Sequence, residues 1–343
     1  MATKRTVGIL GSGGWASRYA AALAQAEDCE LVAVAGGSRA EGFAEKFGLR
    51  READAEAMAA APDIEAVIVA TPHGRHAEHA VPCLAAGKGV LVEKPMATSL
   101  ADCDRMMEAA AASGATLRVA HSRRFFPLVA EARQILRSGK LGRILMMRQT
   151  FCHNAREFGA REGHWMSDPQ LSMGFFIGYG CHQLDMVIHL ADSRVTEVAG
   201  AFANYWRDTP VENCGAMFLR FASGAYTTVW EVCSMPDELG SWPPFPGLCE
   251  RNEIVCEHGL MLLDPYGRLS IRTGDEWETV RELDQRQADP VLDFLAEEVA
   301  CLFRAADGQD AAPLATPEEG RHVVEVCLAG LASSRTHRAV ALA

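Results

Sequence analysis

Residues 6–16 read Thr-Val-Gly-Ile-Leu-Gly-Ser-Gly-Gly-Trp-Ala, an apolar run that ends in a glycine-rich turn. The apolar run predicts a buried strand, and the alanine-rich stretch that begins at Ala16 predicts a helix. In a dinucleotide-binding turn, Gly11 permits the tight bend and Gly13 lets a pyrophosphate approach the backbone at the helix N-terminus. A turn without a ligand is the alternative. The residues expected to contact the cofactor here are Gly11, Gly13, Gly14 and Trp15.

Residues 1–120 alternate β-rich runs with alanine-rich stretches of helical length. This alternation predicts a parallel, doubly wound sheet of the α/β class. The expected strands cover residues 6–10, 31–35, 66–70, 89–92 and 116–120. The expected crossover helices cover residues 16–26, 39–47, 76–86 and 100–113.

The pattern changes after Arg124, where β-forming runs joined by glycine turns predict an antiparallel sheet. The expected strands cover residues 143–153, 195–206, 214–221, 225–233, 253–256, 260–263, 269–272 and 277–283. The expected helices cover residues 127–138, 177–190, 290–305 and 317–336, the last two with Asp289 and Thr316 as N-caps. We therefore expect an N-terminal Rossmann dinucleotide-binding domain over residues 1–123. A C-terminal α+β domain over residues 124–343 should contain one large open, mainly antiparallel sheet, with oligomers forming through its exposed face.

The composition narrows the classes of partner. The chain of 343 residues has a formal net charge of −12, which argues against nucleic acid or an anionic membrane as a partner. No apolar run has the length of a membrane span, and the first residues lead into a strand rather than a signal peptide. The 11 cysteines have no paired metal-ligand spacing and are typical of reduced thiols. We expect a cytoplasmic protein with a small-molecule substrate and no metal site.

Two further segments are expected at the same edge of the parallel sheet as the glycine turn. Residues 90–96 read Val-Leu-Val-Glu-Lys-Pro-Met, a short buried strand that delivers Lys94 to the carboxyl edge, where open α/β sheets bind ligands. Residues 71–76, Thr-Pro-His-Gly-Arg-His, follow the third parallel strand. For residues 90–96 the alternative is an ordinary strand end at which Lys94 is only solvated. The residues expected to contact the cofactor from these segments are Thr71, Pro72, His73, His76, Glu93 and Lys94.

The end of the second strand bears on the choice of cofactor. An NAD-selective fold usually has an acid there for the ribose hydroxyls, whereas this chain has Ser38 and Arg39. A hydroxyl and a guanidinium can instead receive a 2′-phosphate through a charge-assisted contact. These residues therefore favour NADP slightly over NAD. The alternative is that Ser38 caps the following helix and Arg39 is only a surface residue.

In the second domain, residues 174–185 read Gly-Phe-Phe-Ile-Gly-Tyr-Gly-Cys-His-Gln-Leu-Asp. His182 falls near the beginning of the predicted helix, and an imidazole suits proton transfer to or from a substrate oxygen. Asp185 lies one turn later on the same side and can orient it. The alternative is that His182 is a residue of the apolar core.

These motifs occur together, and in one order, in a single family. They are the turn at 11–16, the loop at 71–76, Glu93-Lys94-Pro95, Ser122-Arg123-Arg124-Phe125, Trp165 with Asp168-Pro169, and Gly180-Cys181-His182 with Asp185. In this combination the chain resembles, over nearly its whole length, the Gfo/Idh/MocA oxidoreductases, relatives of glucose–fructose oxidoreductase and inositol dehydrogenase. The resemblance implies a Rossmann domain and an open C-terminal sheet that forms dimers or tetramers. It also implies NAD(P)-dependent oxidation of a secondary alcohol on a sugar, a polyol or another cyclic alcohol.

By this resemblance Lys94 contacts both the nicotinamide ribose and the substrate hydroxyl, and His182 is the acid/base histidine. The expected catalytic residues are thus Lys94 and His182. The residues expected to contact the substrate are Lys94, Arg123, His153, Tyr179 and His182. Two other classes stay open. One is an enzyme with tightly bound NAD(H) that oxidises transiently and eliminates with no net redox change, and the other is a cofactor-binding regulator without turnover.

The departures from the family pattern bear on the substrate. Gly178 stands where the family usually has an acid, while His73 and Ser122 each stand where an asparagine is usual. The loss of a carboxylate that grips adjacent hydroxyls, together with Phe175 and Tyr179, indicates a flatter and less hydroxylated substrate such as a cyclic diol. The side chains that can hold a carboxylate group on such a diol are His153, Arg156 and Arg161.

Overall fold

The computed structural model describes residues 4–152, 164–205, 210–233, 241–242, 245–246, 249–284 and 291–342. The chain divides into two compact units, each made of two segments. Unit 1 comprises Met1–Ser122 and Asp289–Arg321, and unit 2 comprises Arg123–Ala288 and His322–Ala343. The sequence predicts a division between residues 123 and 124, and it assigns the segment 289–321 to the second domain; in the structure this segment groups with unit 1.

Unit 1 is built on a six-stranded, fully parallel sheet with the order β3-β2-β1-β4-β5-β6. Its strands are β1 (Arg5–Leu10), β2 (Cys29–Ala35), β3 (Arg50–Arg51), β4 (Ala66–Val69), β5 (Gly89–Glu93) and β6 (Leu117–Ala120). All four residues of β4 are buried, as expected for a central parallel strand covered on both faces. The chain reverses its direction of winding between β1 and β4, the position where such sheets bind ligands. The prediction of a parallel, doubly wound sheet is confirmed.

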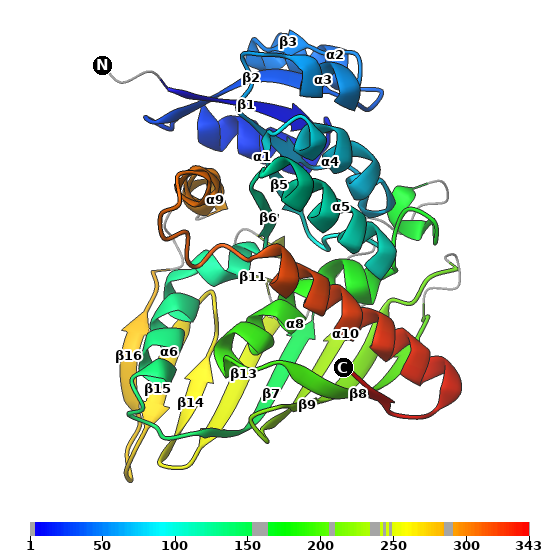
Figure 1. Cartoon of the computed structure of the whole chain (residues 1–343). Helices are drawn as coiled ribbons and strands as arrows, with labels where there is room; N and C mark the ends of the chain where they lie inside the picture. The colour runs from blue at the N-terminus through cyan, green and yellow to red at the C-terminus, as the bar shows by residue number, and fades with distance from the viewer. Residues whose placement is uncertain are drawn as a thin grey trace. The chain divides into compact units, whose positions relative to one another are not determined.

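The helices of unit 1 come from both ends of the chain. They are α1 (Gly14–Leu23), α2 (Ala40–Phe47), α3 (Ala55–Ala60), α4 (His76–Ala85), α5 (Leu100–Ser113) and α9 (Val291–Ala306). Helix α9, drawn in orange in Figure 1, contacts α1, β5 and β6. An amphipathic helix buries its apolar face against a complementary surface. For α9 that surface is on unit 1, so this late segment of the chain belongs to the first unit. The sequence missed β3 because it consists of two exposed arginines without an apolar pattern.

Unit 2 contains a nine-stranded sheet with the order β16-β15-β14-β13-β7-β10-β9-β8-β17. Its strands are β7 (Ile144–Cys152), β8 (Val195–Ala203), β9 (Cys214–Phe221), β10 (Tyr226–Val232), β13 (Cys249–Cys256), β14 (Gly259–Leu263), β15 (Arg268–Arg272), β16 (Glu278–Glu282) and β17 (Val340–Ala341). A separate pair consists of β11 (Ser241–Trp242) and β12 (Phe245–Pro246). Within the large sheet β7 and β10 are parallel and the other pairs are antiparallel. The predicted open, mainly antiparallel sheet is therefore confirmed.

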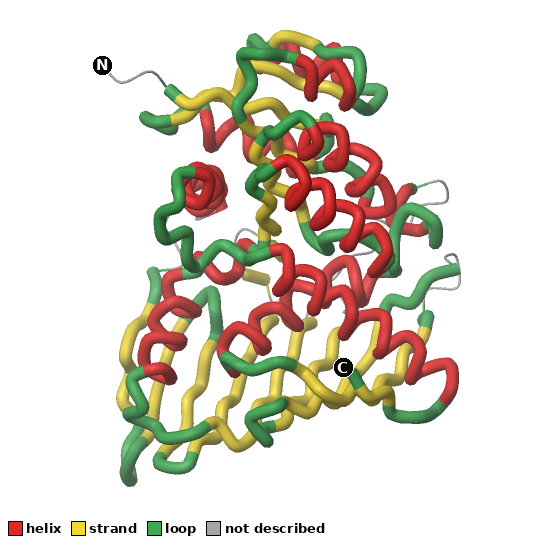
Figure 2. Tube along the Cα trace, in the orientation of Figure 1, coloured by secondary structure: helices red, strands yellow, loops and turns green. Residues whose placement is uncertain are grey.

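Helices cover one face of this sheet, as Figure 2 shows for α6 (Pro127–Arg137) and α8 (Phe175–Ala191). Side chains of β10 alternate accordingly, with Val229 fully buried and Trp230 exposed. Helix α10 (Pro317–Thr336) begins with the predicted cap, since the Glu319 N–H donates to Thr316 Oγ1 at 3.3 Å. The other predicted cap, Asp289, lies outside the described residues. None of the described helices combines the length and apolar character needed to cross a bilayer.

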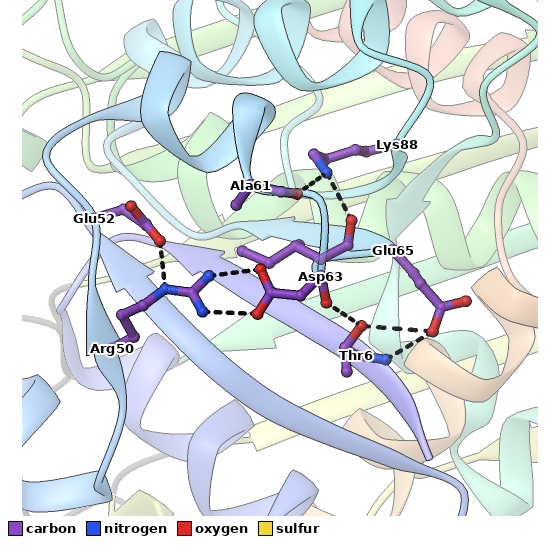
Figure 3. Close-up of polar contacts among 8 residues, drawn as sticks. Thr6, Arg50, Glu52, Ala61, Asp63, Glu65 and Lys88 are labelled. Carbon is purple, nitrogen blue, oxygen red and sulfur yellow. Dashed lines mark hydrogen bonds and ion pairs between the residues drawn. The ribbon is translucent and has the colours of Figure 1, made fainter. Parts of the chain in front are cut away.

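One buried and one exposed set of polar contacts lie at the amino edge of the unit 1 sheet (Figure 3). Lys88 is 8% exposed, and its Nζ donates to the carbonyl oxygens of Ala61 and Ile64 at 2.7 Å each. Close by, Arg50 forms a two-bond ion pair with Asp63, at 2.7 and 2.9 Å. Lys88 immediately precedes β5, so its bonds tie the start of that strand to the turn after α3.

We expect Lys88→Met to lower the free energy of unfolding by about 2 kcal/mol, because two buried carbonyl oxygens lose their donor. Chemical denaturation measures the change. The matched control is Lys140→Met, which removes a half-exposed ammonium that lies 3.5 Å from Glu278. Exposed pairs of this kind contribute under about 1 kcal/mol. Equal and small effects of the two substitutions would contradict the structural role of Lys88.

Candidate active site

The glycine-rich turn lies where β1 ends and α1 begins. Gly11 has a φ of +119°, and its N–H donates to the carbonyl oxygen of Ala35 at 2.8 Å. A Cβ on Gly11 would lie 2.3 Å from the carbonyl oxygen of Ala70, so a larger residue does not fit there. Helix α1 has Gly13 as its N-cap without a side-chain cap, and a Cβ on Gly14 would meet nothing within 4 Å. The first N–H groups of α1 are therefore open to an anion, and the turn fits the pyrophosphate of a dinucleotide.

Ser38 and Arg39 lie at the carboxyl end of β2, and both are exposed. Arg39 Nη2 lies 3.8 Å from the position that a Cβ on Gly13 would take, so the guanidinium stands beside the glycine turn. The N-cap of α2 is Arg39, with no side-chain cap hydrogen bond, which leaves the Ser38 hydroxyl outside that role. Within the described ranges, no carboxylate forms an ion pair with Arg39. Both side chains are thus accessible at the edge of the sheet where the glycine turn lies.

A cavity of about 140 Å³ lies at the same edge of the sheet. Its lining includes Leu10 and Gly36 from the ends of β1 and β2, residues 53–56 at the start of α3, and Thr71. Glu78 and His79 of α4 complete it, with Thr71 Oγ1 and His79 Nδ1 2.9 Å apart. Residues 53–56 were not predicted for this edge, because the turn between β3 and α3 brings them here and no sequence motif marks them.

His76 holds the loop after β4 from inside. Its ring is fully buried, with Nε2 2.9 Å from the carbonyl oxygen of Thr71 and Nδ1 3.0 Å from that of Pro95. Burial lowers the pKa of His76 to about 4, against the opposing effect of these carbonyls, so the ring is neutral and donates to only one of them. His76 therefore joins two loops of the cofactor edge, whereas the sequence placed it in contact with the cofactor itself. His73, just before it, is 7% exposed, and burial lowers its pKa well below the usual range.

Glu93 is the last residue of β5, and Lys94 follows it. Lys94 is partly exposed, and its peptide bond to Pro95 is cis. Glu93 is 6% exposed, and its Oε2 accepts the Lys94 backbone N–H at 3.2 Å. Burial raises the pKa of Glu93 to about 7, although the Lys94 charge opposes this. The buried acid and the accessible lysine thus lie in different environments although they are adjacent.

The register of unit 1 brings three predicted segments to one edge. Leu10, Val69 and Val92 are register partners on the adjacent strands β1, β4 and β5. The glycine turn follows the first of these residues, and the Thr71 loop follows the second. Lys94 lies two positions beyond the third, so it stands on the same sheet edge as the glycine turn.

In unit 2, His182 lies on α8 and is partly exposed. Glu212 holds the N-terminus of this helix, because its Oε1 accepts the Ile177 N–H at 3.3 Å. A Cβ on Gly174, whose φ is +103°, would lie 1.6 Å from Glu212 Oε2, so the carboxyl occupies the space that the glycine leaves. Burial raises the pKa of Glu212 to about 8.

A second buried carboxyl, that of Glu231 on β10, lies against α8. A Cβ on Gly180 would be 2.7 Å from Glu231 Oε2, and Cys233 Sγ donates to Glu231 Oε1 at 3.2 Å. Burial raises the pKa of Glu231 well above its usual range. Although Gly178 carries no carboxyl, strand β10 and the segment before β9 thus supply two acids to α8. The sequence missed both, since each depends on a contact between distant segments.

Two arginines that follow β6 are paired inside unit 2. Arg123 is 5% exposed, forms a buried ion pair with Glu250, and lies 5.2 Å from the centroid of the Phe151 ring. Arg124 Nη2 donates to Asp185 Oδ1 at 2.6 Å, and its Nε donates to Oδ2 at 2.9 Å. Arg123 and Arg124 are thus both buried and ion-paired, and the substrate contact expected of Arg123 stays a prediction. A buried charge requires such a partner.

Aromatic side chains gather near the start of α8. Tyr179 and Trp165 are partly buried and pack against a buried apolar cluster. The members of that cluster are Met166, Phe175, Val211 and Cys233. Burial raises the pKa of Tyr179, so its hydroxyl stays protonated. The predicted substrate residues His153, Arg156 and Arg161 lie outside the described residues.

Comparison with known proteins identifies the class of this fold. A model described as "Oxidoreductase family, NAD-binding Rossmann fold" matches residues 5–121, and the "GFO/IDH/MocA C-terminal domain" matches residues 129–261. The trans-1,2-dihydrobenzene-1,2-diol dehydrogenase of Mus musculus is 36% identical over 239 residues, which are 68% of this chain and 69% of that protein. The 1-carboxy-3-chloro-3,4-dihydroxycyclo hexa-1,5-diene dehydrogenase of Comamonas testosteroni is 32% identical over 217 residues, or 59% of this chain. The chain spans 54%, about half, of the length of that relative.

The fold agrees with these matches. An oxidoreductase domain protein from Kribbella flavida superposes with a TM-score of 0.86 at 21% identity, covering 100% of both chains. Unit 1 contains the residues that match the NAD-binding Rossmann fold of this family. The chain belongs to the GFO/IDH/MocA oxidoreductase family.

Proposed function

We propose that this chain is an NADP-dependent dehydrogenase that oxidises a secondary alcohol on a cyclic, largely apolar substrate such as a diol. The observation that carries the proposal is the common sheet edge of the open glycine turn and Lys94, which follow the register-matched strands β1 and β5. When bound, the nicotinamide supplies the hydride acceptor. The glycine turn holds the pyrophosphate of the dinucleotide, and Arg39 holds the 2′-phosphate of NADP.

Lys94 and His182 have complementary roles in this proposal. The Lys94 ammonium stabilises the negative charge that develops on the carbinol oxygen as hydride leaves the adjacent carbon. His182 accepts the hydroxyl proton in oxidation and returns it in reduction. Three observations support these roles. Both side chains are partly exposed, Lys94 lies at the carboxyl edge of the unit 1 sheet, and the chain belongs to the GFO/IDH/MocA family.

The proposed substrate class follows from the side chains near α8. Tyr179 and Trp165 present apolar surface, and Gly178 offers no carboxylate to bind adjacent hydroxyls. Two relatives are named as dehydrogenases of cyclic diols, one of them carboxylated, which supports the same class. We therefore propose cyclic diols, with or without a carboxylate, ahead of sugars.

A substrate panel tests this proposal. Sugars, linear polyols, cyclic diols and carboxylated cyclic diols are each mixed with the protein and NADP or NAD, and formation of reduced cofactor is followed by absorbance. We expect the highest kcat/KM for a cyclic diol with NADP. A clear preference for hexoses would contradict the substrate class, and no reduction of either cofactor by any alcohol would contradict the function.

Arg39→Ala tests the preference for NADP. The substitution removes the guanidinium beside the glycine turn, so the Michaelis constant for NADP should rise by about tenfold to a hundredfold while that for NAD changes little. The matched control is Arg105→Ala, because Arg105 is exposed and pairs with Asp102 on α5 of the same unit. Equal changes for the two cofactors would show that Arg39 does not bind a 2′-phosphate.

We further propose that the protein is a homo-oligomer formed through the exposed face of the unit 2 sheet. Exposed apolar side chains gather on its strands, with Tyr226 38% and Trp230 42% exposed on β10 and Met146 37% exposed on β7. Tyr226 and Met146 are register partners on adjacent strands. Exposed apolar side chains on adjacent strands of one sheet are typical of an interface.

Trp230→Glu tests the interface. A charge at the centre of an apolar contact should convert a dimer or tetramer into monomers, as measured by analytical ultracentrifugation. The control is Trp277→Glu, a 44% exposed tryptophan next to β16 at the far end of the sheet, which should leave the assembly intact. A monomeric wild-type protein, or an assembly unaffected by Trp230→Glu, would contradict this interface.

We also propose that the protein works in a reducing compartment such as the cytoplasm. Ten cysteines among the described residues are buried thiols without a disulfide. This usage is typical of proteins that are kept reduced.

A further inference from the structure

The first two turns of helix α8 have a low intrinsic tendency to be helical. The N-cap is Gly174, which offers no side-chain cap, and Gly178 and Gly180 lie within the helix itself. Glycine is unfavourable in a helix interior because it loses the most backbone freedom on folding. This part of α8 therefore depends on contacts from elsewhere in the fold. His182 lies directly after it.

Glu212 supplies those contacts from a distant segment of unit 2. Its backbone carbonyl accepts the Phe175 N–H at 3.0 Å, and its side-chain Oε1 accepts the Ile177 N–H at 3.3 Å. Both N–H groups belong to the first turn, where a helix has no partners of its own for them. The carboxyl fits because Gly174 has no Cβ, which would lie 1.6 Å from Glu212 Oε2. Glu212 thus serves as the side-chain cap that the N-cap glycine cannot provide.

The large sheet holds Glu212 in place. Asn213, the next residue, is fully buried, and its N–H donates to the carbonyl oxygen of Ala203 at the end of β8 at 3.1 Å. Its own carbonyl oxygen accepts the N–H of Cys233, which follows β10, at 3.1 Å. On the other side of Glu212, Val211 belongs to the buried apolar cluster that contains the first residue of α8. This short segment therefore connects the sheet to the start of the helix.

The position of His182 depends on the turn that Glu212 caps. In an α-helix each N–H pairs with the carbonyl four residues earlier, so that of His182 pairs with residue 178. Tyr179 lies three residues before His182 and therefore on the same face of the helix. If the first turn opened, both side chains would move. A displacement of about 1 Å in a reacting group can slow a reaction by about a hundredfold.

We propose that Glu212 is a positioning residue, because it caps the first turn of α8 from the sheet and so fixes the places of Tyr179 and His182. The cap requires an oxygen acceptor and no charge. Burial raises the pKa of Glu212 to about 8, and a protonated carboxyl still accepts a backbone N–H through its carbonyl oxygen. The effect on the reaction rests on the proposed function of His182, whereas the cap does not.

Hydrogen exchange tests the cap without any substrate. In Glu212→Ala, the backbone amides of residues 177–181 should exchange about tenfold faster than in the wild type, because the first turns open locally. Residues 184–191 should keep their rates, since Asp185 still pairs with Arg124. Should the alanine variant not fold, Glu212→Asp carries the same test, because its carboxyl is one methylene shorter. Unchanged exchange at 177–181, or an equal increase along the whole helix, would overturn the positioning role.

Steady-state kinetics test the consequence for the reaction. Glu212→Ala should lower kcat by about tenfold to a hundredfold, while the Michaelis constant for NADP changes by less than about twofold. Glu212→Gln keeps an oxygen that can accept the Ile177 N–H, so it should retain most of the rate. A glutamine variant as slow as the alanine variant would contradict the cap.

Glu257→Ala is the matched control on the same unit. Glu257 lies in the turn between β13 and β14, and its Oε2 also accepts a backbone N–H, that of Arg143, at 3.0 Å. Its removal should leave kcat and the exchange of α8 unchanged. A loss of rate equal to that of Glu212→Ala would overturn the positioning role. If the wild type oxidises no alcohol, the proposed function fails, and hydrogen exchange still decides whether Glu212 fixes α8.

Discussion

Lys94→Met is expected to slow hydride transfer by about a thousandfold, or about 4 kcal/mol, while leaving the fold and NADP binding nearly intact. Methionine has a similar length but no charge, so the developing alkoxide loses its stabilising ammonium. Lys94 is partly exposed at the carboxyl edge of the unit 1 sheet, so its removal leaves no cavity in the core. Rapid mixing with a cyclic diol and NADP measures the single-turnover rate, and fluorescence titration measures the cofactor affinity.

Two controls give this result its meaning. Lys94→Arg keeps the charge and should retain part of the rate, because a guanidinium places its charge differently. Lys140→Met removes a surface lysine and should change nothing. A Lys94→Met protein that transfers hydride at the wild-type rate would exclude Lys94 from the chemistry. Loss of cofactor binding together with the rate would mean that Lys94 mainly holds the cofactor.

His182→Gln is expected to lower kcat by about a hundredfold to a thousandfold at neutral pH and to change the pH profile. Glutamine can keep a hydrogen bond to the substrate oxygen, but it cannot accept the hydroxyl proton. Hydroxide must then remove the proton, so the rate of the variant should rise with pH over the range where the wild type reaches a plateau. Steady-state rates across pH measure both effects.

The control for this prediction lies on the same helix. His189 is 7% exposed on α8, and burial lowers its pKa to about 3, so it is a neutral core residue. His189→Gln should lower the melting temperature but keep the shape of the pH profile. If His182→Gln also keeps the wild-type profile, another group carries the proton.

Local patterns predicted much of the fold. The helices at 100–113 and 317–336 have the expected bounds because both ends carry local signals, such as the Ser99 cap and Gly114 with φ +74°. Strands β3 and β17 have two residues each and were missed, since an apolar period cannot be read from so short a run. The grouping of α9 with unit 1 was missed for a different reason: it depends on packing between distant segments.

The distinction between local sequence signals and contacts of distant segments also applies to the candidate site. Gly11 and Lys94 were predicted because each follows a strand, and the edge of a parallel sheet is defined by strand order. Glu212 and Glu231 were not, because a lone glutamate carries no sequence signal until the fold buries it. The ion pair of Asp185 with Arg124 was not predicted either, since it joins two segments that are distant in the sequence.

Isotope transfer tests the central claim most directly. A cyclic diol deuterated at its carbinol carbons is incubated with the protein and NADP, and the reduced cofactor is analysed by mass spectrometry. We predict one deuterium atom in each NADPH molecule, delivered to the nicotinamide ring, and no such product from Lys94→Met over the same time. Reduced cofactor without deuterium, or no reduced cofactor with any cyclic diol, would contradict the account.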